Sequence, residues 1–498
     1  MMLYLSSFVL FYAMPYVITE QAFYKAAVVE LASNVSNVEE RFFHGSREYF
    51  AFMEQAGREN VDIIVFPEYG LTGSQLTNED LQKFGIELPN PSNNVLPCIV
   101  QNSYNQLLTN LSCAAKRNKI YVVANVIEKI NEDENVEYHN TNIVLDRYGI
   151  LIARYRKINL SPHEDIFVPG NKIDTFKTDF NVNFGMFISS DISFKRPSLD
   201  VLKDHQVTDI IYSNHQSDFQ TSSLMQHGYV KSNGVNLLTA TLKNLNEDNE
   251  MGQIYVYNGT IIRNNIHFIN SSKMITAELP VFKLRPDIFR KCQNGHRLKS
   301  ASKTNNFFSS AFENSLNYVT LPLNLSENYA KKILCSKGED FCCTFEIQFE
   351  VTTNSSYLYK LMVVEDPLKF CAIAACINEN ITSCGGINEQ QSTGISFKNI
   401  SVTTITLQDN ADRPFMLLPN LTISNNYNYC KHRIENIVEI TVSITNKEDS
   451  LTAIGIFILD YNSVNNLNNI ILNWFLFVTC TVTVLTIIYK RGNFKIVH

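Results

Sequence analysis

Residues 184–192 read Phe-Gly-Met-Phe-Ile-Ser-Ser-Asp-Ile, and this stretch predicts a buried strand that runs into a tight turn. The turn presents the hydroxyl of Ser189. Similar apolar strands alternate with amphipathic helices through the first two-thirds of the chain, which predicts a layered α/β domain. The expected strands are residues 26–31, 61–66, 120–124, 143–146, 150–155, 184–188 and 209–212, and the expected helices are residues 38–57 and 102–117.

The residue composition and the expected secondary structure change near residue 300. Short β-branched runs follow, at 345–352, 395–406 and 437–444, and seven of the ten cysteines between Cys98 and Cys430 lie in this last third. A chain of 498 residues is long enough for two or three units. We therefore predict an α/β domain over residues 20–300 and a β-rich domain over residues 301–462. The net charge of -7 and the lack of a basic tract argue against a nucleic-acid partner.

The two ends of the chain predict export and membrane attachment. Residues 1–19 are apolar without an acidic side chain, which is typical of a secretory signal peptide; a membrane-anchoring first helix is the alternative. Residues 470–489 are uncharged and long enough to cross a bilayer, and Lys490 and Arg491 follow them. A single-span anchor is favoured, and a glycosylphosphatidylinositol (GPI) attachment signal is the alternative.

Glycosylation sequons and cysteines agree with an oxidising, extracellular compartment. Ten Asn-X-Ser/Thr sequons occur, one of them at Asn159. The nine expected to carry glycans are Asn34, Asn110, Asn258, Asn270, Asn324, Asn354, Asn380, Asn399 and Asn420. Ten cysteines lie between Cys98 and Cys430, an even number suited to disulfides, and Cys98 and Cys113 are spaced to close a local loop.

A zinc site is the rival interpretation of the cysteine-rich third. The adjacent pair Cys342 and Cys343 lacks the usual C-x-x-C spacing of zinc ligands. Disulfides are therefore favoured, and neither a metal nor a cofactor is expected.

Three polar side chains stand where strands end. Glu68 follows the apolar strand 61–66, Lys157 closes the second arm of a predicted hairpin, and Ser189 follows the strand 184–188. Each residue alone is a weak signal, because a charged residue at a strand end is most often simply solvated. In this order and with these neighbours, the three positions resemble the Glu-Lys-Cys triad of the nitrilase, or carbon-nitrogen hydrolase, superfamily.

The resemblance narrows to the vanin and biotinidase branch, and insect-type vanin-like proteins are the most similar. It is carried by residues 111–116 (Leu-Ser-Cys-Ala-Ala-Lys), by residues 120–125 (Ile-Tyr-Val-Val-Ala-Asn) and by the cysteine-rich last third. It implies an α-β-β-α sandwich followed by a β-rich base domain. It also implies an amidase that cleaves pantetheine or biotin amides. A homodimer paired through the sandwich is a further expectation.

Residue roles follow from the same resemblance. Glu68 would be the general base, Lys157 would stabilise the oxyanion, and Glu164 would be a supporting carboxylate. Ser189 occupies the position of the nucleophilic cysteine, and the sequence has no cysteine between Cys113 and Cys292 to replace it.

The serine makes amide attack difficult. The pKa of a hydroxyl is about seven units above that of a free thiol, and this gap corresponds to up to ~10 kcal/mol for forming the anion. Residues 213–216, Ser-Asn-His-Gln, also differ from the proline and nearby tryptophan usual in this branch. His215 as an alternative base for Ser189 is a minor hypothesis.

Two functions remain. The favoured one is an inactive or severely impaired amidase that binds a small amide or an unknown extracellular partner. The alternative is a working amidohydrolase of the pantetheinase or biotinidase type that uses Ser189.

Overall fold

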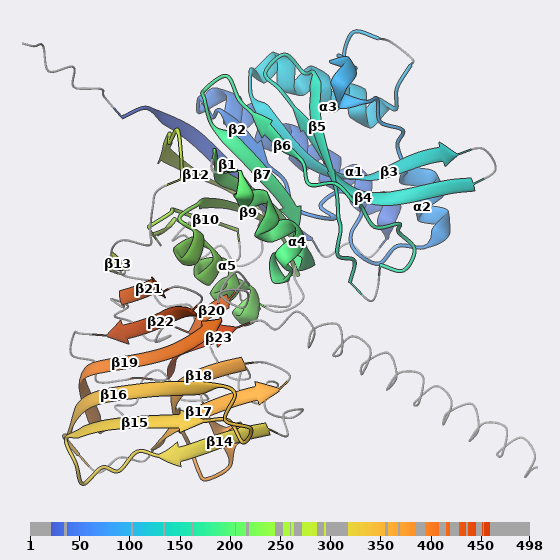
Figure 1. Ribbon diagram of the computed structural model, residues 1–498. Helices are drawn as coiled ribbons and strands as arrows, with labels where there is room; N and C mark the ends of the chain where they lie inside the picture. Colours follow the sequence, from blue (N-terminus) through green and yellow to red (C-terminus); the bar gives the residue numbers. More distant parts are fainter. Residues whose placement is uncertain are drawn as a thin grey trace, which may run out of the picture.

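The computed structural model describes most of residues 21–458 (Figure 1). The described ranges are 21–33, 37–100, 103–132, 135–161, 164–204, 206–215, 219–244, 252–258, 260–262, 271–285, 293–294, 317–353, 357–366, 369–384, 394–407, 415–418, 428–434, 437–444, 451 and 453–458. Outside them lie the predicted leader, the boundary near residue 300, the tail 470–489 and the sequons at Asn34, Asn270, Asn354 and Asn420. Among the described helices, none combines the length and apolar composition that crossing a bilayer requires.

A twelve-stranded sheet forms the N-terminal part, in the order β5-β4-β3-β2-β1-β9-β8-β7-β6 with β10, β11 and β12 beside it. Its strands are β1 (Phe23–Ser33), β2 (Ile63–Val65), β3 (Tyr121–Glu132), β4 (Asn135–Leu145), β5 (Leu151–Arg156), β6 (Thr175–Lys177), β7 (Asn183–Ile188), β8 (Val207–His215), β9 (Asn236–Asn244), β10 (Gln253–Tyr255), β11 (Ile261–Ile262) and β12 (Lys273–Pro280). Neighbours from β3 through β2, β1, β9 and β8 to β7 pair in parallel, so these strands end at one edge.

The sheet curves until its two halves face each other. The ring of Tyr24, on β1, lies 5.8 Å from that of Phe184, on β7, and the Tyr24 hydroxyl donates to Asp209 Oδ1, on β8, at 2.5 Å. Apolar side chains from both halves form one core. The two sheets of the expected sandwich are therefore two halves of a single, nearly closed sheet.

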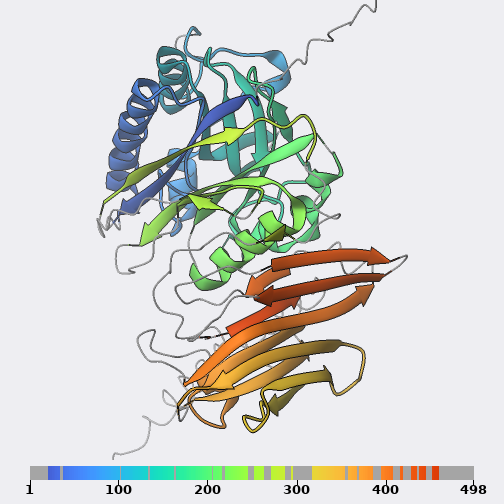
Figure 2. The same ribbon diagram turned by 90° about the vertical axis from the view of Figure 1, so that its left-hand side faces the viewer.

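Helices cover the outer face. The main helices are α1 (Val38–Arg58), α2 (Asn78–Phe84), α3 (Gln106–Asn118), α4 (Lys195–Ser198) and α5 (Phe219–Asn233). Helices α1 and α3 lie along one face of the sheet (Figure 2). They bury residues such as Met53 and Leu111 against the alternate side chains of β1, β2 and β3. The strand alternation thus separates an inner core from an outer, helix-covered core.

Two packed sheets form the C-terminal part. They have the orders β13-β21-β22-β19-β16-β15 and β14-β17-β18-β23-β20. The strands are β13 (Gln293–Asn294), β14 (Asn317–Pro322), β15 (Tyr329–Cys335), β16 (Cys342–Val351), β17 (Leu358–Asp366), β18 (Lys369–Cys376), β19 (Ile395–Leu407), β20 (Phe415–Leu418), β21 (Asn428–Ile434), β22 (Ile437–Ile444) and β23 (Ala453–Ile458). The β-rich structure predicted for this region is confirmed.

Strand β18 belongs to two cores at once. Cys371 and Ile373 face the second sheet, whereas Ala372 and Ala374 face helix α5 and the N-terminal core. Helix α5 lies between the two parts of the chain in both views (Figures 1 and 2). A strand buried on both faces reads as a continuous apolar run, as residues 370–376 do.

Strand β4 is longer than the sequence predicts. Only residues 143–146 are expected as its strand, but it begins at Asn135 and pairs with β3 along its whole length. Residues 139–142, His-Asn-Thr-Asn, interrupt the apolar pattern although they are all buried. One of them, Asn140, belongs to the site described below.

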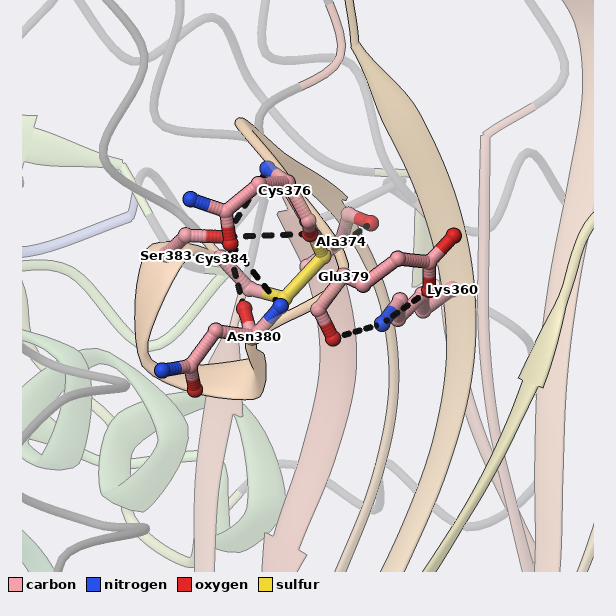
Figure 3. Close-up of a disulfide and its surroundings, with 8 residues drawn as sticks. Lys360, Ala374, Cys376, Glu379, Asn380, Ser383 and Cys384 are labelled. Carbon is pink, nitrogen blue, oxygen red and sulfur yellow. Dashed lines mark hydrogen bonds and ion pairs between the residues drawn. A yellow bond between two sulfur atoms is a disulfide. The ribbon is translucent and has the colours of Figure 1, made fainter.

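Disulfides hold the β-rich part. The described pairs are Cys98–Cys113, Cys335–Cys342, Cys343–Cys371 and Cys376–Cys384, and Cys430 is also disulfide-bonded. The local Cys98–Cys113 loop is as expected, and the adjacent Cys342 and Cys343 have different partners. Cys376–Cys384 closes the end of β18, beside the ion pair of Lys360 with Glu379 (Figure 3). These paired cysteines are unavailable as zinc ligands.

Loss of the inter-sheet disulfide is expected to destabilise the protein more than loss of a short-loop one. Cys343 and Cys371 are separated by 28 residues, for which chain entropy gives about 3.5 kcal/mol. Cys335 and Cys342 are separated by 7, which gives about 2.5 kcal/mol. Urea unfolding of the two double-alanine variants measures both values. An equal or larger loss for the shorter loop would contradict this ranking.

Candidate active site

Four strands bring the predicted residues to one pocket. Glu68 lies three residues past β2, Lys157 and Ser189 directly follow β5 and β7, and His215 ends β8. The pocket has a volume of about 390 Å³. Its lining residues are Glu68, Tyr69, Ser74, Gln75, Leu76, Lys157, Ser161, Glu164, Ser189 and His215. All four residues expected from the sequence, Glu68, Lys157, Glu164 and Ser189, are therefore present in its wall.

A buried lysine joins two buried carboxylates. Lys157 Nζ donates to Glu68 Oε1 at 2.8 Å and to Glu164 Oε2 at 2.7 Å. The three residues are 0–5% exposed. Within the described part of the chain, Glu68 Oε2 has no hydrogen-bond partner although it is buried. The cluster thus keeps one carboxylate oxygen for another proton donor.

Amide and phenol side chains missed by the sequence reasoning complete this cluster. Asn140 Nδ2 donates to Glu68 Oε1 at 2.8 Å and to Glu164 Oε1 at 2.9 Å. Tyr69 OH also donates to Glu164 Oε1, and the Tyr69 amide donates to Asn125 Oδ1 at 2.9 Å. The signal for Asn140 was its place in a polar run that directly precedes the apolar end of the strand, residues 143–145.

Burial and charge set the protonation of the cluster. Burial, together with the negative charge of Glu164, raises the pKa of Glu68 to about 7, although Lys157 opposes the shift. Burial also opposes the charged form of Glu164, but Lys157 outweighs it and lowers the pKa of Glu164. The two carboxylates likewise outweigh burial and raise the pKa of Lys157. Near neutral pH, Lys157 and Glu164 are charged and Glu68 titrates, as a general base requires.

Ser189 sits in a left-handed turn. Its φ is +43°, and Tyr69, next to Glu68, has φ +55°; both values are uncommon for residues other than glycine. Such backbone conformations cluster at functional sites. The Ser189 hydroxyl donates to Asn214 Oδ1 at 3.3 Å and to the main-chain oxygen of His215 at 3.5 Å. Both contacts are long, so the hydroxyl is held weakly.

The imidazole of His215 is poorly suited to activate Ser189. Burial and the positive charge of Lys157 lower the pKa of His215 to about 4. Its ring packs edge-on to Tyr69, with 5.6 Å between centroids. The contact of Ser189 with His215 goes to the main chain instead, which leaves Glu68 as the better base.

Other sequence-predicted positions lie away from the pocket. Asn110, Asn324 and Asn380 are exposed, whereas Asn258 and Asn399 are half-buried. In the described ranges, no group of three or more histidine, cysteine or acidic side chains is arranged to hold a metal ion.

Comparison with known proteins agrees with both parts of the fold. The sequence model of the Carbon-nitrogen hydrolase family matches residues 25–247, and that of the Vanin C-terminal domain matches residues 309–464. Vanin-like protein 1 of Drosophila melanogaster is 27% identical, covering 81% of this chain and 77% of its own. Pantetheinase of Mus musculus is 28% identical, covering 66% of this chain and 67% of its own.

Similarity also extends to a solved structure. Saccharomyces cerevisiae Nit3, a member of branch 10 of the nitrilase superfamily, gives a TM-score of 0.43 at 21% identity, covering 52% of this chain and 90% of its own. The stretch matched by the first family model contains most of the nearly closed sheet, and the stretch matched by the second contains most of the disulfide-rich sheets. The chain thus combines a domain of the Carbon-nitrogen hydrolase family, over residues 25–247, with a Vanin C-terminal domain, over residues 309–464.

Proposed function

We propose that this protein binds a small linear amide, of the pantetheine or biotin-amide type, and hydrolyses it only at a severely reduced rate. The observation that carries the proposal is that a hydroxyl, Ser189, shares the pocket wall with Glu68 and Lys157. The pantetheinase relatives support the class of ligand.

The intact part of the site supports amide binding. Lys157 has three N–H donors, and its two carboxylate partners accept two of them. Within the described residues the third donor is free for the oxygen of an amide carbonyl. The same donor would stabilise the oxyanion formed if a nucleophile attacked that carbonyl. In this proposal Glu68 is the base and Glu164 fixes the lysine.

The nucleophile limits turnover. Glu68, whose pKa is about 7, is a far weaker base than an alkoxide, so it removes the hydroxyl proton only in concert with attack on the carbonyl. A thiol near pKa 8.5 needs little such help. The pocket therefore favours binding over cleavage of an unactivated amide.

A second candidate function is hydrolysis of an easier acyl group, such as an ester, by Ser189. It is favoured by the unpaired oxygen of Glu68, which is buried and belongs to a group that titrates near pH 7. An ester needs less nucleophilic assistance than an amide, because alkoxide leaves more readily than amide ion.

Calorimetry combined with product analysis tests the proposal. Pantetheine and a biotinyl amide are titrated into the native protein, and the mixture is then analysed for released amine. We expect saturable binding of at least one amide with little release. Leu76→Trp, which fills the pocket from its wall, is expected to abolish binding. Absence of binding, or rapid release, would contradict the proposal; rapid cleavage of an ester analogue alone would favour the second candidate.

A pH profile should report Glu68. In the Ser189→Cys variant, kcat/KM for pantetheine is expected to fall about tenfold per pH unit below about 7. The reason is that Glu68 must be deprotonated to act as a base, and protons bind it below its raised pKa. Adding Glu68→Gln is the control, and it should abolish this fall of kcat/KM at acidic pH. A profile that stays flat down to pH 5 would contradict the assignment.

The sequence and the disulfides indicate where in the cell the protein acts. The disulfides fit an oxidising compartment. We infer an extracellular glycoprotein that is held at the membrane by residues 470–489. An unknown extracellular protein partner and a homodimer remain predictions.

A further inference from the structure

Asp191, two residues after Ser189, is fully buried and accepts four hydrogen bonds. One donor is its own turn, through the amide of Ile188 at 3.1 Å. The other three come from the segment that carries Lys157. Tyr155 OH donates at 2.7 Å, and the amide and Nδ2 of Asn159 each donate at 2.8 Å.

These donors flank Lys157 on both sides in sequence, since Tyr155 and Asn159 are each two residues away. A further bond runs the opposite way, from Ser190 Oγ to the main-chain oxygen of Asn159 at 2.5 Å. The turn that presents Ser189 is therefore fastened to the end of β5 by four bonds between the two segments. We call Asp191, Tyr155 and Asn159 the clamp.

The clamp uses the atom that glycosylation would modify. Asn159 begins the sequon Asn159-Leu160-Ser161. Its Nδ2 donates both to Asp191 Oδ1 and to the main-chain oxygen of Arg196, each at 2.8 Å. Transfer of an oligosaccharide from its lipid diphosphate carrier would form a bond from Nδ2 to the sugar, release the lipid diphosphate and remove one N–H proton. One N–H would remain for two acceptors.

We propose that Asp191 is a positioning residue that holds the Ser189 turn against Lys157, and that this clamp and glycosylation of Asn159 exclude each other. Folded protein with an assembled pocket thus carries no glycan at Asn159. The positioning role of Asp191 rests on the proposed function. The incompatibility between the clamp and a glycan on Asn159 concerns the fold alone, so it holds even if the protein binds no amide.

Glycopeptide mass spectrometry of the folded, full-length protein tests the exclusion. We expect an unmodified Asn159 peptide and glycans at the exposed Asn110, Asn324 and Asn380. Ser161→Ala, which removes the sequon but keeps Asn159, should leave the glycan mass unchanged. Asp191→Asn should raise the occupancy of Asn159. Glycans on most Asn159 residues of monodisperse native protein would overturn the proposal.

Thiol reactivity tests the positioning role without any hydrolysis. In Ser189→Cys, the introduced thiol shares the pocket wall with the Lys157 ammonium. It should therefore be alkylated by iodoacetamide with an apparent pKa below the usual value of about 8.5. Adding Asp191→Asn should shift that pKa upward and lower the alkylation rate at pH 7 several-fold. Adding the milder Tyr155→Phe, which removes one bond, should give a smaller shift in the same direction.

Asp209→Asn is the matched control. Asp209 is also fully buried, and it accepts bonds from Tyr24, Thr208 and Asn236 on the far side of the core. Its replacement should lower stability and leave the alkylation profile unchanged. Identical profiles for the parent, Asp191→Asn and Tyr155→Phe proteins would overturn the positioning role.

Discussion

Replacement of Ser189 by cysteine is expected to raise the rate of pantetheine hydrolysis by about two to four orders of magnitude. The gap in pKa between hydroxyl and thiol sets an upper limit of ~10 kcal/mol. Concerted proton removal by Glu68 recovers more than half of this, so about 3–5 kcal/mol remains, and each 1.36 kcal/mol is tenfold in rate. Cysteamine release, followed with a primary-amine reagent after protein removal, measures the change.

The position of the thiol should matter as much as its presence. Ser74→Cys places a thiol in the wall of the same pocket but outside the left-handed turn of Ser189. This variant should hydrolyse no faster than the native protein. If Ser189→Cys is also inactive, the changed segment 213–216 blocks the site as well. If the native protein matches Ser189→Cys, the serine is a competent nucleophile and the proposed impairment is wrong.

Replacement of Lys157 by methionine is expected to cost about 3–5 kcal/mol of unfolding free energy. Removing one partner of a buried ion pair leaves an uncompensated charge, and here two carboxylates face the vacated place. Without the lysine, the pKa values of both carboxyl groups rise above their unfolded values. Stability should therefore be lost progressively as pH rises, so the deficit in urea unfolding should be larger at pH 8 than at pH 5.

Lys172→Met is the control for this effect. Lys172 also pairs with a carboxylate, Asp174, but its side chain is 77% exposed. Exposed pairs contribute about 0–1 kcal/mol, so this variant should unfold close to the native midpoint. If Lys157→Met and Lys172→Met lowered the free energy of unfolding equally, Lys157 would not stabilise its two buried carboxylate partners as proposed.

The strands that carry the site were predictable because they are buried on both faces. The runs at 63–66 and 184–188 contain no polar side chain, and they correspond to β2 and β7. Glu68 and Ser189 were recognisable as polar residues immediately beyond such runs. Lys157 was recognisable from its place at the end of a hairpin arm.

The remainder of the site was not predictable, because it depends on contacts distant in sequence. Asn140 lies 72 residues from Glu68, and the hydrogen bond between them exists only because β3 and β4 pair beside β2. The closure of the sheet was likewise hidden, since strand periodicity fixes which face is buried and not what covers it. Pairing of Cys343 with Cys371 rather than with a nearer cysteine also depends on how two sheets stack.

The most direct test asks whether Ser189 ever becomes acylated. Native protein is mixed with excess pantetheine at pH 7.5, quenched at intervals, and the peptide containing residues 184–192 is analysed by mass spectrometry. We expect an unmodified Ser189 and no stoichiometric release of amine. An ester of the pantothenoyl group on Ser189, formed with a matching burst of cysteamine, would contradict it.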